Sequence, residues 1–184
     1  MDNEVWNANN KKNHRKEGTK QTYYREMEEK RFSKIACKFI RDFNQGKRIM
    51  HYIDTGVIIS YLNENDVNHS RALETLKQIG DMVISQIVTL ELRSVLARTT
   101  NLNEYEIEAY IEYLSEIKLK VSEIDFNDVF SNAEEIAFKI KMRTLDILHL
   151  SACMMLNANT FVTFDHEFAE KKNVIAEFGL NVLS

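Results

Sequence analysis

Four acidic residues stand where their carboxylates could share one divalent cation: Asp54, Glu91, Asp146 and Asp165. Carboxylates that lie close together repel one another, and a bound cation removes that repulsion. Hard oxygen ligands select Mg²⁺ or Mn²⁺. Such an ion can activate a water molecule and stabilise the charge that develops when a phosphodiester is displaced. The four residues therefore predict a metal site that needs no nucleophilic side chain, and no Cys–His or Ser–His–Asp arrangement is evident.

Each acid also has a structural explanation. Asp54 and Asp165 could cap the helices that follow them, because Asp is a favoured N-cap residue. Glu91 borders an apolar helical stripe, where Arg93 or Arg98 could neutralise it. Because two strands end in the same way, in Asp54 and in Asp165, we favour the site over the caps. We interpret Glu91 as pointing into the same cleft.

Asp146 opens a helix that is otherwise nearly all apolar. An acid in the first turn is favoured by the helix dipole, which is the structural explanation. Because the rest of this helix is apolar, we interpret its N-terminus as pointing to the active edge of the domain. His149 follows one turn later. A histidine in such a segment is more often a packed or hydrogen-bonded core residue than a ligand, so the predicted metal site excludes it.

Strands and helices are predicted to alternate from residue 49 onward. The predicted strands are 49–53, 82–85, 119–122, 160–164 and 180–183, and the predicted helices are 55–63, 68–79, 87–98, 104–117, 127–141, 145–156 and 166–171. This alternation predicts a parallel sheet covered by helices on both faces. Sites in such sheets lie beyond the C-terminal ends of the strands, near a topological switch point. Asp54 and Asp165 both occupy such strand ends.

The composition predicts a soluble, cytoplasmic protein without a membrane segment. Hydrophobic residues make up 44% of the chain, enough for a packed core, and no apolar stretch reaches the ~20 residues that span a bilayer. The two distant cysteines, Cys37 and Cys153, form neither a disulfide framework nor a metal finger. Five glycines assemble no phosphate loop, which argues against P-loop or dinucleotide binding.

Residues 1–48 differ in charge from the rest of the chain. They carry 13 Lys and Arg against 7 Asp and Glu, whereas residues 49–184 carry 11 against 21. Residues 1–20 are predicted to be a disordered tail, because few of them are apolar. Residues 21–48 are predicted to form a basic amphipathic helix. Its basic face carries Lys30, Lys34, Lys38 and Arg41.

Three interpretations of this extension remain open. We rank first the docking of its helix on the domain that follows. The second is that its basic face gathers a phosphate backbone toward the acidic body. The third is that translation begins at Met50. For contacts nearer the site, we name Arg93 and Arg143 as candidate nucleic-acid-binding residues.

Four motifs carry the acids in order: YIDTGVIISYL at 52–62, TLEL at 89–92, DILHLSA at 146–152 and FVTFDHEF at 161–168. Their order and spacing over residues 49–184 resemble those of the PIN-domain nucleases, especially the VapC-type toxins of prokaryotes. Two departures are visible. Gly56 stands where Asn is common in that family, and most single-domain toxins lack an extension such as residues 1–48.

The resemblance implies a PIN-like α/β/α sandwich with a five-stranded parallel sheet and a Mg²⁺- or Mn²⁺-dependent endoribonuclease that cleaves RNA. It also implies that Asp54, Glu91, Asp146 and Asp165 are the metal-site acids, with Thr55 and Thr163 as polar support. Proteins of this kind usually form homodimers and are held inactive by a small antitoxin protein, so the resemblance implies both partners here.

Two alternatives remain: a PIN-like RNA-processing nuclease outside a toxin system, and a catalytically weak RNA-binding module. A phosphatase with a strand-terminal Asp is a third class. It would need a second Asp at position 56, and Gly56 argues against it.

Overall fold

A computed structural model describes residues 49–184 of the chain. The disordered tail predicted at 1–20 and the basic helix predicted at 21–48 lie outside the described residues. The same holds for four of the candidate nucleic-acid-binding residues: Lys30, Lys34, Lys38 and Arg41.

Five parallel strands form a sheet in the order β3-β2-β1-β4-β5. The strands are β1 (Met50–Ile53), β2 (Asp81–Ser85), β3 (Leu119–Ser122), β4 (Thr160–Val162) and β5 (Asn181–Leu183). The predicted five-stranded parallel sheet is confirmed, and each predicted strand boundary lies within two residues of the observed one. The chain leaves β1 toward β2 and later returns to β4 on the other side of β1. The switch point therefore lies between β1 and β4.

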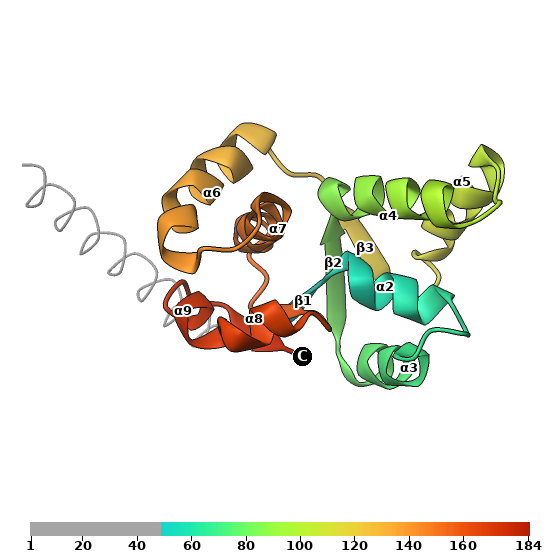
Figure 1. Ribbon diagram of the computed structural model, residues 1–184, viewed down its shortest axis with the longest axis horizontal. Coiled ribbons are helices and arrows are strands. Elements are labelled where there is room, and N and C mark those ends of the chain that lie inside the picture. Colours follow the sequence, from blue (N-terminus) through green and yellow to red (C-terminus); the bar gives the residue numbers. More distant parts are fainter. Residues whose placement is uncertain (1–48) are drawn as a thin grey trace, which may run out of the picture. The chain divides into compact units, whose positions relative to one another are not determined.

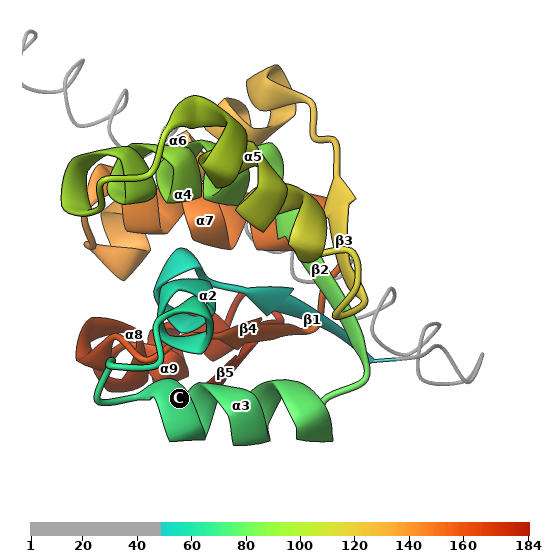
Figure 2. The ribbon, with the colours of Figure 1, turned by 90° about the vertical axis from the view of Figure 1, so that its right-hand side faces the viewer.

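Helices cover both faces of this sheet (Figure 1). They are α2 (Thr55–Leu62), α3 (His69–Gln78), α4 (Gln86–Thr99), α5 (Glu104–Tyr113), α6 (Phe126–Ile140), α7 (Thr144–Met155), α8 (His166–Glu170) and α9 (Lys172–Ala176). Helices α2 to α5 lie on one side of the strands and α6 to α9 on the other, as right-handed crossovers in two opposite directions require. Figure 2 shows α2 to α5 from their own side. Within residues 49–184, every helix is too short or too polar to cross a membrane.

Two helical segments differ from the prediction. The helix predicted at 104–117 ends at Tyr113, and a turn leads to Lys118, whose φ of 63° is left-handed. The backbone N–H of Leu119 donates to the carbonyl of Leu114 at 3.1 Å, a hydrogen bond typical of a helix stop with a left-handed residue. The predictions also omitted α9, a short helix of five residues that follows α8 directly.

An aromatic stack joins the two central strands to the helix that follows β4. The ring of Phe161 in β4 lies 5.5 Å from that of Tyr52 in β1 and 4.6 Å from that of Phe168 in α8. All three side chains are fully or almost fully buried. Such aromatic pairs stabilise a core beyond the area that they bury. The stack therefore fixes the ends of β1 and β4 next to each other, where the chain carries Asp54 and Thr163.

Candidate metal centre

The ends of β1 and β4 are joined through one buried threonine. The hydroxyl of Thr163 donates to Asp54 Oδ2 at 2.7 Å and accepts the backbone N–H of Asp165 at 3.1 Å. The backbone N–H of Asp54 in turn donates to the carbonyl of Val162 at 2.9 Å. These bonds hold the Asp54 carboxylate at the switch point of the sheet, where sites of open parallel sheets form.

The capping explanation applies to only one of the two strand-terminal acids. Asp165 Oδ1 accepts the backbone N–H of Glu167 at 2.8 Å and so caps α8. Asp54 occupies the N-cap position of α2, but its side chain makes no capping hydrogen bond. Its carboxylate is bonded to Thr163 instead. Asp165 thus has a structural role in addition to its place at the site, whereas the position of Asp54 is not explained by helix capping.

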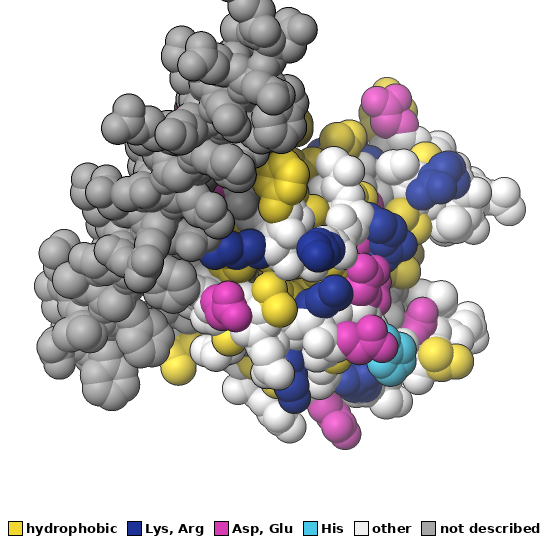
Figure 3. All heavy atoms as spheres, turned by 60° about the vertical axis from the view of Figure 1, so that its left-hand side comes forward, with side chains coloured by type: hydrophobic (Ala, Val, Ile, Leu, Met, Phe, Trp, Pro, Cys, Tyr) yellow, Lys and Arg dark blue, Asp and Glu magenta, His cyan; other side chains and the backbone are white. Residues whose placement is uncertain are grey.

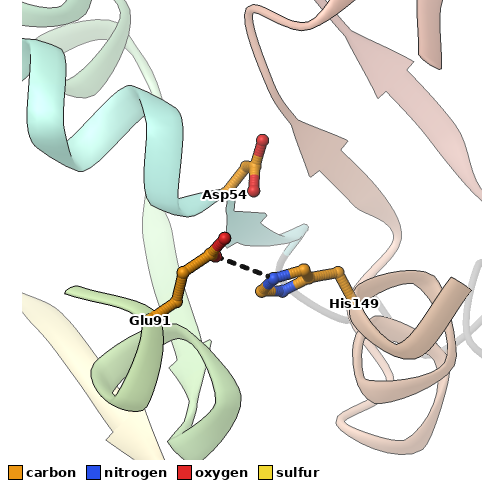
Figure 4. A group of neighbouring side chains, drawn as sticks. All are labelled: Asp54, Glu91 and His149. Atoms are coloured by element: carbon orange, nitrogen blue, oxygen red, sulfur yellow. Dashed lines mark hydrogen bonds and ion pairs between the residues drawn. The ribbon is translucent and has the colours of Figure 1, made fainter. Parts of the chain in front are cut away.

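Glu91 and His149 approach Asp54 from the two helical layers (Figure 4). Glu91 comes from α4 and His149 from α7, and their Oε2 and Nε2 atoms lie 3.1 Å apart. One ligand atom from each of Asp54, Glu91 and His149 lies within 4.8 Å of the other two. These three residues form what we call the inner group.

Behind the inner group, a chain of hydrogen bonds runs into the core. His149 Nδ1 lies 3.1 Å from the Tyr52 hydroxyl, which lies 2.8 Å from Ser85 Oγ. His149 is therefore buried and hydrogen-bonded, as expected of a core histidine, but it also borders the candidate metal site. A weak signal of this second role was present in the sequence, because Asp146 and His149 are spaced to share one helix face.

The other two acids lie together further along the same cavity. Asp146 Oδ2 accepts Arg143 Nε at 2.9 Å, and Asp165 Oδ2 accepts Arg143 Nη2 at 3.1 Å. We call these three residues the outer group. Asp54, Glu91, Asp146 and Asp165 all line this cavity, whose volume is about 560 Å³. The structure thus brings the four predicted acids to one place, and their role as metal ligands stays a prediction.

The basic residues near the site take different positions. Arg143 lines the cavity. Arg93 instead donates Nε and Nη2 to the Glu108 carboxylate at 2.6 and 2.8 Å, between α4 and α5. Arg98 donates Nε to the carbonyl of Ser94 at 3.0 Å. Glu91 is hydrogen-bonded to His149 instead; the charge of Arg98 helps to lower its pKa, but neither arginine forms an ion pair with it within residues 49–184.

The pKa values of the two acids of the inner group are shifted in opposite directions. Burial raises the pKa of the Asp54 carboxyl above its usual value, against the opposing effects of His149 and of the hydrogen bond from Thr163. The hydrogen bond to His149 lowers the pKa of Glu91, against the effect of burial. A cation between them would favour the ionised form of Asp54, because an opposite charge offsets the cost of burying a carboxylate.

The donor set fits a divalent cation. Two carboxylates and one imidazole nitrogen lie within reach of one ion. The hydroxyl of Thr55 is buried at the same cavity and lies close enough to the Glu91 carboxylate to contribute to lowering its pKa. Gly56 also lines the cavity, and a Cβ there would make only an ordinary contact with Asp54 Oδ2 at 3.9 Å.

Neutralising Asp54 is expected to stabilise the metal-free protein at neutral pH. The folded state holds the Asp54 proton more tightly than the unfolded state, so stability is lost as pH rises from about 3.8 through the raised pKa. Asp54→Asn removes this loss and keeps an oxygen that accepts from Thr163. If the relief is about 1 kcal/mol, Tm rises by roughly 2–4 °C for a chain of this size. Thermal melts in chelator from pH 4 to pH 7.5 measure it.

The control for this experiment is Asp125→Asn. Asp125 caps α6 through hydrogen bonds from the Asn127 and Asp128 backbone N–H groups, and Asn caps equally well. Its melting temperature should follow that of the wild type at each pH. A Tm of Asp54→Asn below that of the wild type at pH 7.5 would show that the ionised carboxylate stabilises the fold.

The sequence and the fold of this chain are similar to those of known proteins. Residues 51–174 match the PIN domain family. Three solved structures show a similar fold. The first, VapBC2 from Rickettsia felis bound to a promoter DNA fragment, is 18% identical with a TM-score of 0.54, and the match covers 74% of this chain and 100% of that chain. The second, VapBC-1 from nontypeable Haemophilus influenzae, is 18% identical with a TM-score of 0.56, over 74% of this chain and 98% of that chain. The third, VapC20 from Mycobacterium tuberculosis, a sarcin-ricin loop cleaving toxin, is 14% identical with a TM-score of 0.53, over 65% of this chain and 93% of that chain. At these identities the likeness concerns the fold. No curated protein gave a significant match.

Proposed function

This chain belongs to the PIN domain family, and on that premise we propose that it is a metal-dependent endoribonuclease acting as the toxin of a toxin–antitoxin pair. One observation carries the proposal. Asp54, Glu91 and His149 converge within 4.8 Å in a cavity that Asp146 and Asp165 also line. Acids this close have no structural need for one another, whereas hydrolysis of a phosphodiester has a use for a cation held between them.

The proposed ligands are the carboxylates of Asp54, Glu91, Asp146 and Asp165, with His149 beside them. When bound, a divalent cation supplies a water of lowered pKa and positive charge for the phosphate oxygens. Oxygen ligands suit Mg²⁺, and an imidazole nitrogen in the same set suits Mn²⁺ as well. Thr163 holds the Asp54 carboxylate in place, and the Thr55 hydroxyl lies at the cavity wall beside Glu91.

RNA is the proposed substrate for three reasons. The cavity of about 560 Å³ is of the size that encloses one small molecule or one nucleotide unit. Figure 3 shows Lys and Arg side chains among the acids on the face that it turns forward, so a polyanion does not meet a uniformly acidic surface there. One structural neighbour is itself a toxin that cleaves the sarcin-ricin loop.

The proposed partners are a small antitoxin and a second copy of this chain. Exposed aromatic side chains four and eight residues apart on α6 support a protein interface, because neighbouring exposed apolar groups mark interaction surfaces. Phe126 is 46% exposed, Phe130 54% and Phe138 84%. Light scattering of the purified chain, alone and with the product of an adjacent gene for a small DNA-binding protein, tests this part of the proposal.

Cleavage of RNA is expected to require Mg²⁺ or Mn²⁺. We expect the purified full chain to cut an end-labelled RNA with either ion, to lose the activity in EDTA, and to regain it when the ion is restored. The physical reason is that the proposed attacking group is a water molecule, which needs the ion to lower its pKa near neutral pH. Gel analysis of the fragments, with a DNA of the same sequence as a second substrate, measures both requirement and selectivity.

Three outcomes would change the proposal. Equal cleavage in EDTA would remove the metal from the mechanism. Tight RNA binding without cleavage under any ion would favour the RNA-binding module. Cleavage by the chain without growth arrest when it is produced in a bacterium would favour an RNA-processing nuclease over a toxin.

A further inference from the structure

The outer group differs from the inner group because it already contains a cation. The Arg143 guanidinium joins Asp146 and Asp165 through two separate nitrogens, at 2.9 and 3.1 Å, and its Nε lies 3.8 Å from Glu167 Oε2. Asp146 belongs to α7, Asp165 is the N-cap residue of α8 and Glu167 belongs to α8, so the guanidinium connects these two helices. Arg143 thus neutralises two of the four predicted ligands.

The backbone directs Arg143 to this place. Lys141 ends α6 in the left-handed region with φ of 54°, and Arg143 is the N-cap residue of α7 with extended backbone angles. The short turn between these helices therefore delivers the guanidinium to the rim of the cavity, one turn before Asp146. Its side chain remains 69% exposed, whereas that of Asp146 is 14% exposed.

An arginine in this position can leave the carboxylates easily. Ion pairs at exposed side chains contribute little to stability, since water competes for both partners. A divalent ion carries twice the charge and binds carboxylate oxygens directly, so it outcompetes a guanidinium at the same oxygens. The displaced guanidinium stays at the cavity rim, because its backbone belongs to the rigid turn before α7. There it meets the phosphate groups of a bound nucleic acid, for which its planar fork is suited.

We propose that Arg143 is exchanged between two partners: it neutralises Asp146 and Asp165 while the site lacks metal, and it binds a substrate phosphate once a metal ion has displaced it. This inference rests on the proposed nuclease function and adds to it a named phosphate-binding residue and a built-in competitor for the metal. Loss of Arg143 should strengthen metal binding through the first role and weaken RNA binding through the second, so the two roles can be measured separately.

The test is Arg143→Gln in the full chain, with Mn²⁺ and RNA as separate probes. Without its internal competitor, the variant should bind Mn²⁺ about threefold to tenfold more tightly, measured by electron paramagnetic resonance of free Mn²⁺. The same variant should show a KM for RNA that is about tenfold higher, because one charged contact to phosphate is lost. Arg143→Lys should retain part of both effects of the native side chain, since it keeps the charge and loses the fork.

The matched control is Lys77→Gln, which removes one positive charge at the exposed end of α3, outside the cavity. It should change neither the Mn²⁺ affinity nor the KM. Weaker Mn²⁺ binding by Arg143→Gln would overturn the exchange and show that Arg143 organises the ligands. Tighter Mn²⁺ binding with an unchanged KM would overturn the phosphate role alone. The Mn²⁺ measurement needs no cleavage, so it decides the metal part even if the wild type proves not to cut RNA.

Discussion

Asp54→Asn is expected to lower metal-dependent RNA cleavage by at least about 100-fold while the protein stays folded. Even residues that only support a metal ligand are worth about 10–100-fold in affinity or activity, so loss of a ligand charge should cost more. The variant keeps an oxygen for the Thr163 hydroxyl, now 2.7 Å from Asp54 Oδ2, so the ends of β1 and β4 remain joined. Single-turnover cleavage with excess enzyme, together with far-ultraviolet circular dichroism, measures both parts.

Metal-dependent RNA cleavage is also expected to fall when each of the other three acids is replaced by its amide. Glu91, Asp146 and Asp165 line the same cavity as Asp54. Asp165→Asn is informative, because Asn can still cap α8 and the variant separates the cap from the charge. Asp125→Asn is the control, since it changes an aspartate at a helix cap outside the cavity. Full activity in Asp54→Asn, with the control equally active, would rule out the four-acid mechanism.

The sheet and two of its acids could be predicted because they depend on local pattern. Short apolar runs mark strands, alternation with helices makes them parallel, and residues after the strands must lie at one edge. Asp54 and Asp165 follow from this alone. Strand β4 is shorter than predicted and ends at Val162. The backbone N–H of Thr163 still donates to the carbonyl of Leu183 in β5, and the chain turns away directly afterwards, where the Asp165 backbone N–H donates to the Thr163 hydroxyl.

The partners of these acids could not be predicted, because they depend on how helices pack across the sheet. Glu91 and His149 are 58 residues apart and meet only because α4 and α7 approach the end of β1 from opposite layers. Periodicity places Glu91 beside an apolar stripe but does not say what faces it. For the same reason, Arg93 and Arg143 were equivalent candidates in the sequence. Packing pairs Arg93 with Glu108 and brings only Arg143 to the cavity.

His149 offers the sharpest contrast between a core residue and a site residue. Its ring is 2% exposed and lies between the Tyr52 hydroxyl and the Glu91 carboxylate. His149→Ala removes both hydrogen bonds and leaves a void, so we expect a loss of about 2–4 kcal/mol in the free energy of unfolding. Urea denaturation measures this loss. Tyr52→Phe keeps the aromatic stack and should cost about 1–3 kcal/mol, because it leaves the buried Ser85 Oγ and His149 Nδ1 without this partner.

Stability alone does not separate the two roles, but the pH dependence of cleavage does. The hydrogen bond to His149 is the main cause that lowers the pKa of Glu91, so its removal raises that pKa. A higher pKa leaves less ionised Glu91 at acidic pH. The acid limb of the cleavage profile should therefore move to higher pH in His149→Ala, and His149→Gln, which can still donate to Glu91, should restore part of the shift. If cleavage by His149→Ala keeps the wild-type profile below its melting temperature, His149 acts through the core, and Glu91 is positioned by other contacts.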